Sequence, residues 1–335
     1  MQSGSRYKKL FSSFNKLNIM IIGDVMVDSY LWGKVERISP EAPIPIVSLK
    51  KRENRMGGAA NVAMNIRSLG ANPILCSVIG VDEKGDQFLD LMKKEKMSDA
   101  GIIRSVRRIT TTKFRIFGNS YQMLRVDEEV DHDLVEGDYL TMVRVIDHLL
   151  KTRKIDCIIF QDYDKGVITP KLINHVVNSA AEHNIPVTVD PKRKNFIHYK
   201  DVTLFKPNLK ELKDGLNMDA DPGELQVLKE ATRRLQEQLN CRYVLTTMSE
   251  KGVMISVQED NERSEIMVPA HPRLISDVSG AGDTVISVAS LCLALQASPD
   301  EIANISNLAG GLVCEEVGVV PINKEKLLRE LINLL

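Results

Sequence analysis

The sequence lacks a long apolar run and lacks an excess of charge of one sign. Nowhere do about 18 apolar residues follow one another, as a membrane-spanning helix would need, and the N-terminus has no apolar signal core. Lysine and arginine number 44 against 45 aspartate and glutamate, which gives a net charge of −1. We therefore expect a cytoplasmic protein with neither membrane nor nucleic acid among its partners.

Cysteine is also scarce. The five cysteines are odd in number, scattered and set among apolar neighbours, with no C-x-x-C spacing. We expect reduced, buried thiols instead of a disulfide framework or a metal site. These cysteines are Cys76, Cys157, Cys241, Cys292 and Cys314.

Two common nucleotide-binding motifs are missing. Gly33-Lys34-Val35 has neither the upstream glycine nor the Ser/Thr of a P-loop. No G-x-G-x-x-G follows the first expected strand, at residues 18–22. The first absence excludes a P-loop nucleotidase, and the second argues against a dinucleotide-dependent oxidoreductase.

The remaining pattern fits an α/β protein with a large core, since 43% of the residues are hydrophobic and 27% charged. Helical patterns over 137–152 and from Thr169-Pro170 alternate with strand patterns over 155–160 and 185–189. Such alternation predicts a mostly parallel sheet with helices on both faces. We expect residues 1–335 to form one domain, although the length alone would also allow two.

Polar residues follow several expected strand ends, where ligands bind in open α/β sheets. Gly23-Asp24 predicts that the first strand opens into a loop, in which Asp24 and Asp28 could hold a polar ligand. Turn chemistry for one of these acids is the alternative. Lys192 follows a later strand and is either a phosphate contact or a surface lysine.

Gly57 and Gly58 precede a helical pattern of small and apolar residues over 62–69. Paired glycines let a ligand approach the backbone, and the amide of Asn61 offers both a donor and an acceptor. The alternative is a plain turn into a core helix.

Two segments suggest a small sheet outside the main one. Three prolines between residues 40 and 45 exclude helix from 32–51 and suit edge strands. Residues 110–117 and 121–126 alternate around Gly118-Asn119-Ser120, which predicts a hairpin. At its end, Arg125 could reach a substrate phosphate or be a solvated arginine.

Asp277 to Thr284 forms a glycine-rich turn that opens an apolar helix. Backbone N–H groups of Gly280, Ala281 and Gly282 lie at the positive end of the helix dipole, where an anion binds. Asp283 would repel that anion, so its presence suggests a base that takes a proton from a group attacking a phosphate. The alternative is a helix start with an acid favoured by the dipole.

This stretch resembles the C-terminal signature of the ribokinase-like (PfkB) carbohydrate kinases, D-T-x-G-A-G-D. The resemblance implies that Asp283 is the catalytic base and that the amides of 280–282 form an anion hole. It also implies the ribokinase-like fold with a β-sheet lid, from segments of about 30–56 and 108–126. In that family the lid is often a dimer contact, so we expect a homodimer through the lid.

Gly57 to Asn61, a glycine pair followed by an asparagine, resembles the N-terminal signature of the same family. By this resemblance Asp28, Gly57, Gly58 and Asn61 bind the sugar. An apolar outer face of the lid would carry Ile44, Ile46 and Phe117, which one subunit cannot easily cover.

The nucleotide side of the site follows from the same resemblance. Lys206 to Glu211 resembles the P-N-x-x-E motif that positions ATP phosphates and Mg²⁺, with Glu211 reaching the metal through water. Without the other motifs, a proline-preceded helix start is the alternative. The residues implied to bind ATP are Asn208, Lys210, Glu211, Thr247, Ser249 (where relatives often have glycine), Gly252 and Asn307.

A narrower resemblance is to the heptose 7-phosphate kinases, through Ile38-Ser39-Pro40-Glu41-Ala42-Pro43 and a D-Y-x-K-G motif at Asp162. It implies phosphorylation of a heptose 7-phosphate at O1 for ADP-heptose and lipopolysaccharide core synthesis, with Arg125 and Lys192 holding the substrate phosphate. Alternatives are a kinase for ribose or fructose 1-phosphate and a non-catalytic sugar or nucleotide sensor. The H-x-G-H motif of bifunctional relatives is absent before Leu335, so we expect the kinase alone.

Overall fold

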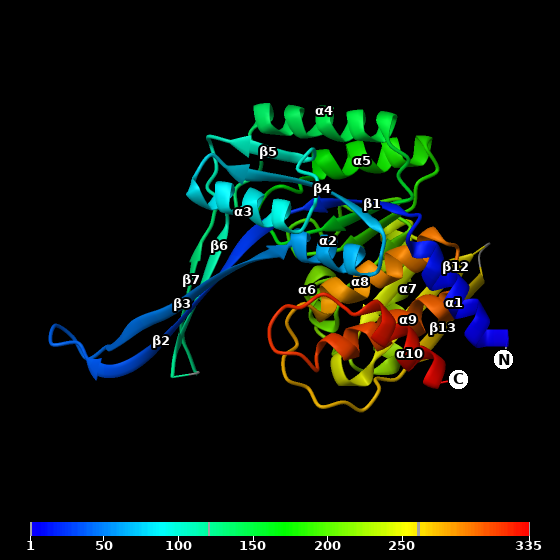
Figure 1. Cartoon of the computed structure of the whole chain (residues 1–335). Helices are drawn as coiled ribbons and strands as arrows, with labels where there is room; N and C mark the ends of the chain where they lie inside the picture. The colour runs from blue at the N-terminus through cyan, green and yellow to red at the C-terminus, as the bar shows by residue number, and fades with distance from the viewer. Residues whose placement is uncertain (1, 120, 260–261, 335) are drawn as a thin grey trace.

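The computed structural model describes residues 2–119, 121–259 and 262–334, which form one sheet of nine strands and one of four (Figure 1). The large sheet contains β1 (Asn18–Gly23), β4 (Asn72–Gly80), β5 (Ile102–Ser105), β8 (Cys157–Gln161), β9 (Val187–Asp190), β10 (Leu204–Phe205), β11 (Tyr243–Thr247), β12 (Val253–Glu259) and β13 (Glu262–Val268). The small sheet, which we term the lid, contains β2 (Val25–Ile38), β3 (Pro45–Gly58), β6 (Thr112–Gly118) and β7 (Tyr121–Glu128).

Helices cover the large sheet. They are α1 (Gln2–Phe14), α2 (Ala59–Ser68), α3 (Glu83–Lys94), α4 (Glu136–Thr152), α5 (Pro170–Glu182), α6 (Leu209–Gly215), α7 (Leu225–Leu239), α8 (Ala281–Ala294), α9 (Pro299–Val313) and α10 (Lys324–Asn333), with a 3₁₀ turn at Ser249–Lys251. In the part of the chain that the structure describes, every helix is too short or too polar to span a bilayer.

The large sheet has the strand order β13-β12-β11-β10-β9-β8-β1-β4-β5. Its strands from β11 to β5 pair in parallel, and β12 pairs antiparallel with both β11 and β13. The prediction of a mostly parallel sheet is therefore confirmed. Its parallel strands all end on one edge, which brings the loops after β1, β8, β9 and β10 together.

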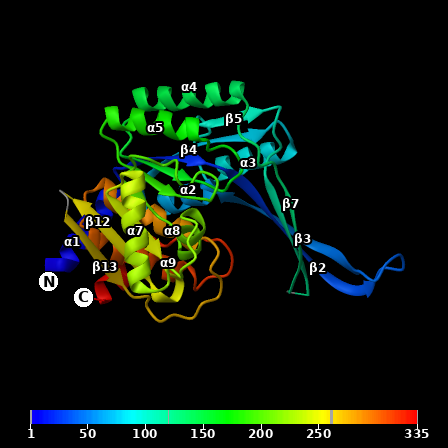
Figure 2. The ribbon, with the colours of Figure 1, turned by 180° about the vertical axis from the view of Figure 1, so that it is seen from behind.

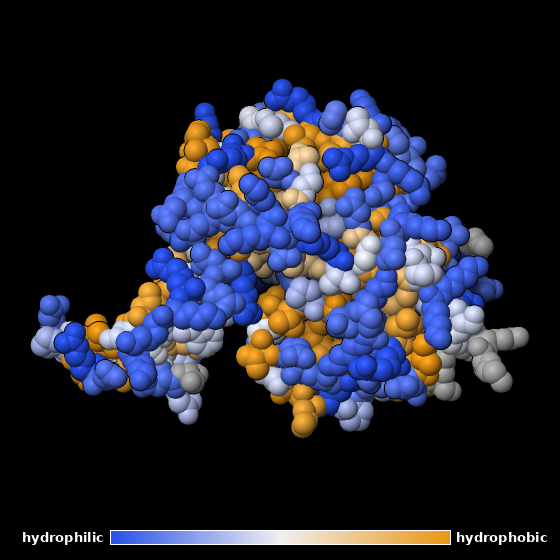
Figure 3. Space-filling model, viewed as in Figure 1, coloured by the Kyte–Doolittle hydropathy of each residue, from blue (hydrophilic) through white to orange (hydrophobic). Residues whose placement is uncertain are grey.

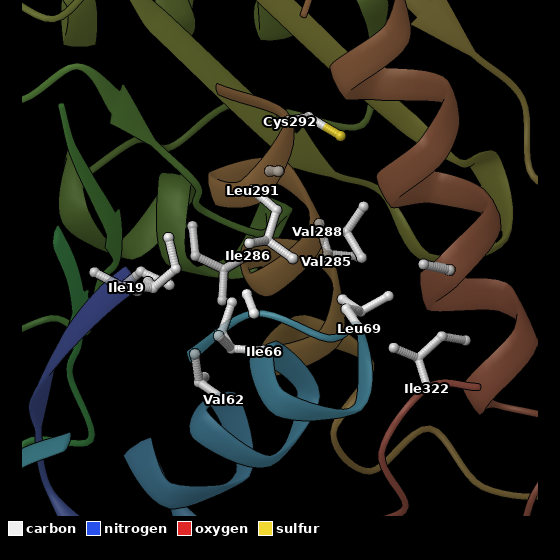
Figure 4. Close-up of a cluster of buried hydrophobic side chains, with 14 of the residues drawn as sticks. Ile19, Val62, Ile66, Leu69, Val285, Ile286, Val288, Leu291, Cys292 and Ile322 are labelled. Atoms are coloured by element: carbon white, nitrogen blue, oxygen red, sulfur yellow. The ribbon is translucent and has the colours of Figure 1, made fainter. Parts of the chain in front are cut away.

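Both faces of this sheet are buried, as predicted for a parallel sheet. Alternate residues of β1 enter two separate cores: Ile19 and Ile21 join one, and Met20 and Ile22 join the other. The first core contains α2, α8 and α9, and the second contains α4, α5 and α7. Figure 4 shows apolar side chains of α2 and α8 meeting in the first core. All five cysteines are buried and free, as expected.

The lid grows directly out of this core. β2 begins at Val25, a single residue after β1, so the loop predicted at Asp24 to Asp28 is wrong: Asp28 lies inside β2. Pairing with β3 on one side and β6 on the other supplies the backbone partners that favour a strand there. The alternative of a plain turn at Gly57 and Gly58 is also wrong, because β3 continues through Gly58 and leads directly into α2.

The lid extends away from the main body in both ribbon views (Figures 1 and 2), and a notch separates the two in the space-filling view (Figure 3). The predicted hairpin is confirmed as the antiparallel pair β6 and β7; Ser120, in its turn, lies outside the described residues. Ile44 is exposed, as expected, whereas Ile46 is half-buried and Phe117 stacks on Trp32 with ring centroids 4.1 Å apart.

Candidate active site

The start of α8 is a tight turn held by backbone geometry. Gly280 precedes the helix at φ 81°, a left-handed conformation that an L side chain would strain. The carboxylate of Asp277 accepts the N–H of Ser279 at 2.9 Å and of Gly318 at 3.0 Å, which fixes the turn from both sides. The sequence therefore builds a rigid helix N-terminus at the predicted anion site.

The first turn of α8 faces a buried ion pair. Lys206 Nζ lies 3.0 Å from Asp190 Oδ1, and both side chains are almost fully buried. A Cβ added to Gly282 would lie 3.6 Å from that ammonium group. The N–H of Ala281 makes a long contact of 3.3 Å to the carbonyl of Val278. The helix dipole therefore favours an anion here, while the ammonium group of Lys206 attracts it and the carboxylate of Asp190, 3.7 Å from the same Cβ, repels it.

Asp283, in the first turn of α8, is 6% exposed and accepts three hydrogen bonds. Tyr163 Oη and Gln161 Nε2 donate to Oδ1 at 2.8 and 3.1 Å, and Asn61 Nδ2 donates to Oδ2 at 2.5 Å. One donor comes from α2 and two come from the end of β8 and the loop directly after it, and all three are far from Asp283 in the sequence.

The environment of Asp283 suits a base that works near neutral pH. Burial raises the pKa of its carboxyl to about 6, and Asp190 adds to this, whereas Asn61, Tyr163 and Lys206 oppose it. A pKa close to the working pH combines ionised base with useful proton affinity. The geometry therefore allows Asp283 to accept a proton from a bound hydroxyl.

Asp28 lies at the base of the lid, where two neighbours crowd it. Its carboxylate forms an ion pair with Arg115 of β6. A Cβ on Gly57 would lie only 2.3 Å from Asp28 Oδ2, so glycine is needed for β3 to pass this carboxylate. The φ of Gly58 is 63°, and a Cβ added there would lie 2.3 Å from the carbonyl oxygen of Asp24. The glycine pair therefore makes room for protein groups at the position where the sequence predicts an approaching ligand.

The two predicted phosphate contacts both have partners within the chain. Arg125, on the exposed strand β7, forms an ion pair with Asp127. Lys192, half-buried, forms an ion pair with Glu211; burial lowers its pKa, but the charges of Asp190 and Glu211 outweigh burial and raise it. A substrate phosphate would have to compete with these carboxylates.

The predicted ATP residues after β10 form a capping box. Asn208 accepts the N–H of Glu211 at 2.8 Å, and Glu211 Oε2 accepts the N–H of Asn208 at 2.9 Å. Thr247 joins them, because its N–H donates to the carbonyl of Pro207 at 3.0 Å. Both carboxylate oxygens of Glu211 thus have partners, Oε1 being paired with Lys192.

The other predicted ATP residues are less tightly connected to this group. Ser249 begins a short 3₁₀ turn at φ 54°, and Gly252 follows the turn at φ 91°. Ser249 thus adopts the conformation that the glycine of relatives would favour. Lys210 is exposed. The buried amide of Asn307, on α9, donates to the carbonyl of Pro269 at 2.9 Å.

Several site residues carried no assigned role in the sequence. Gln161, Tyr163, Asp190 and Lys206 all follow or end strands of the parallel sheet, and that shared position is the signal that could have identified them. Arg115 had no such signal. Arg115 on β6 lies directly opposite Arg125 on β7. The prediction named Arg125, but the arginine that pairs with Asp28 is Arg115, on the neighbouring strand.

Metal binding depends on a single predicted carboxylate. Among the described residues, no group of three or more His, Cys, Asp or Glu side chains is arranged to hold a metal ion. Glu211 fits Mg²⁺ only as an indirect contact, because both of its oxygens already have protein partners.

Comparison with known proteins gives one matching family. Residues 16–326 match the family described as pfkB family carbohydrate kinase. The chain is 34% identical to the bifunctional protein HldE of Caulobacter sp. strain K31 and 36% identical to that of Campylobacter jejuni strain RM1221, over 95% of its own length in each case. It spans 64% and 65% of the length of these relatives.

Solved structures show the same fold at low sequence identity. Phosphofructokinase-2 from Escherichia coli, in complex with potassium, superposes with a TM-score of 0.76 at 17% identity, covering 94% of this chain and 99% of that one. Ribokinase from Arabidopsis thaliana, complexed with ribose and ATP, gives 0.70 at 16% identity, covering 93% and 98%. The expected ribokinase-like fold with a β-sheet lid is confirmed.

Proposed function

Because the chain belongs to the pfkB family of carbohydrate kinases, we propose that it phosphorylates a heptose 7-phosphate at O1, using ATP. The observation that carries the choice of sugar is the similarity to HldE proteins over 90–95% of the chain. The motif at residues 38–43 and the D-Y-x-K-G motif at Asp162 agree with it. The product, heptose 1,7-bisphosphate, would serve ADP-heptose and lipopolysaccharide core synthesis.

In this proposal the chain supplies a base and an anion site. Asp283 accepts the proton of the attacking hydroxyl, an effect worth roughly 10²–10⁴-fold. The first-turn amides of α8 and the buried ammonium of Lys206 stabilise negative charge on the transferring group, each such donor being worth about 3 kcal/mol. ATP when bound supplies the phosphoryl group, and Mg²⁺ near Glu211 would offset its charge.

The sugar would lie between this base and the lid. Asp28 would accept hydrogen bonds from sugar hydroxyls, and its ion pair with Arg115 would fix its orientation. Arg125 and Lys192 stay predictions as phosphate contacts, each having to exchange a carboxylate partner for the phosphate.

We also propose that the lid forms a homodimer contact. It carries exposed apolar side chains on three of its strands and on the loop between β2 and β3, and pairing two lids about a two-fold axis would cover them. These residues are Ile38, Ile44, Leu49, Tyr121, Met123, Leu124 and Val126.

The sugar is tested by a coupled ADP assay over a panel of acceptors: heptose 7-phosphate, the unphosphorylated heptose, ribose and fructose 1-phosphate. We expect the highest kcat/KM with heptose 7-phosphate and a marked loss without its phosphate. A higher kcat/KM with ribose or fructose 1-phosphate would overturn the choice of sugar. Binding of sugar and nucleotide without turnover of any acceptor would instead support a non-catalytic sensor.

A further inference from the structure

Donors from the described residues fill three acceptor positions on the carboxylate of Asp283. An ionised carboxylate offers about four lone-pair sites, two on each oxygen. Tyr163 and Gln161 fill both sites of Oδ1, and Asn61 fills one site of Oδ2. One site on Oδ2 is left for an incoming hydroxyl.

Tyr163 reaches this position because a second buried acid holds its loop. Asp24 accepts backbone N–H groups from Tyr163, Lys165 and Val167 at 3.0, 3.2 and 3.0 Å. Asp24 is 1% exposed and lies at the end of β1, next to the end of β8. The loop after β8 is therefore fixed to the sheet by three hydrogen bonds, so the phenol is held in place before any substrate binds.

We propose that Tyr163 is a positioning residue: together with Gln161 it holds Oδ1 of Asp283, so that Oδ2 takes the proton of the acceptor hydroxyl. This inference rests on the proposed role of Asp283 as the base. As the acceptor oxygen bonds to the γ-phosphorus, the bond from phosphorus to ADP breaks and ADP leaves with that electron pair. The acceptor proton passes to Oδ2, where the free site lies.

The hydroxyl of Tyr163 also favours the ionised base, because it donates to the charged form. Removing it should therefore raise the pKa of Asp283. Asp190 from β9 acts on this carboxylate in the same direction as burial, whereas Lys206, after β10, and Lys192, after β9, act against it. Lys192 Nζ lies 5.9 Å from the centroid of the Tyr163 ring, so the variant at this position must keep the ring.

The test is Tyr163→Phe, which keeps the ring and removes the hydroxyl. We expect the acid limb of its kcat profile to move up by about one pH unit. The ratio of variant to wild-type kcat should be about tenfold lower at pH values below the wild-type limb than at pH values above the shifted limb. Because both enzymes are assayed with the same substrates at each pH, the ratio of their kcat values removes the effect of protonation of ATP and of the sugar phosphate.

Tyr199→Phe is the matched control. Its hydroxyl also donates to a buried aspartate, Asp162 at 2.6 Å, and that aspartate makes no contact with Asp283 among the described hydrogen bonds. Its kcat ratio should not vary with pH. A pH-independent ratio for Tyr163→Phe, or the same limb shift in Tyr199→Phe, would overturn the proposal.

A carboxyl ¹³C NMR titration of substrate-free protein, with the Asp283 signal identified by its loss in Asp283→Asn, gives a readout that needs no acceptor. The pKa of Asp283 should be about one unit higher in Tyr163→Phe than in wild type. If heptose 7-phosphate is not turned over, the proposed function fails while this titration still decides the role of Tyr163. An unchanged pKa would refute that role whichever sugar is used.

Discussion

Gly57→Ala should disable the sugar site with little effect elsewhere. The new Cβ would lie 2.3 Å from Asp28 Oδ2 and 2.9 Å from Cγ of Met26. Restoring van der Waals separation requires the Asp28 carboxylate to move by about 1 Å, which also disturbs its ion pair with Arg115. A displacement of about 1 Å in a substrate-positioning group costs on the order of 100-fold in rate, so we expect kcat/KM for the sugar to fall by about that factor.

The assay is steady-state kinetics with the accepted sugar, together with ATP affinity by calorimetry and Tm. ATP affinity should stay within about twofold of wild type, because the three atoms nearest the new Cβ belong to Asp28 and Met26 and none belongs to α8. Gly137→Ala is the control, since a Cβ at that position meets nothing within 4 Å. Wild-type kcat/KM in Gly57→Ala would refute the assignment of Asp28 to the sugar site.

Four further predictions concern the site and the lid. Asp283→Asn should lower kcat by two orders of magnitude or more with ATP affinity unchanged or slightly tighter, and retention of a tenth of wild-type kcat would contradict its role as base. In the wild type, kcat should fall as the pH drops through about 6, because a carboxyl whose pKa burial raises to that value becomes protonated there. Asp28→Ala should raise the KM for sugar sharply at constant ATP affinity, and equal loss of both would indicate misfolding. Light scattering should give a dimer at micromolar concentration that dissociates on Leu124→Asp; a wild-type monomer would disprove pairing through the lid.

The fold was largely predictable because its signals are local. Continuous apolar strand patterns separated by helical patterns predict a parallel sheet. The helix cap predicted at Thr169-Pro170 is also found, since the Thr169 side chain accepts the N–H of Leu172 at 3.2 Å. The loop expected after Asp24 is the main error. Val25 to Asp28 is strand because β3 and β6 pair with it, and such long-range pairing leaves little mark on a short segment.

The site was predictable only in part. Asp283 and its glycine turn carry a compact motif, and Asn61 shares one hydrogen bond with that acid. Tyr163 and Gln161 reach the same carboxylate from 120 and 122 residues away, so no spacing along the chain could reveal the contact. The choice between Arg115 and Arg125 depends on the registry of one hairpin, which alternation alone does not determine.

The lid is connected to the core without flexible linkers, so a rotation of the lid about its base moves its far end through a large distance. β2 follows β1 after one residue, and β3 runs without a break into α2, whose Asn61 donates to Asp283. The 14 residues of β2 span about 45 Å, so a rotation of about 10° at the base would carry the far end about 8 Å. Conversely, a force applied at the far end by a second subunit would act on the base through a long arm, with no slack linker to absorb it.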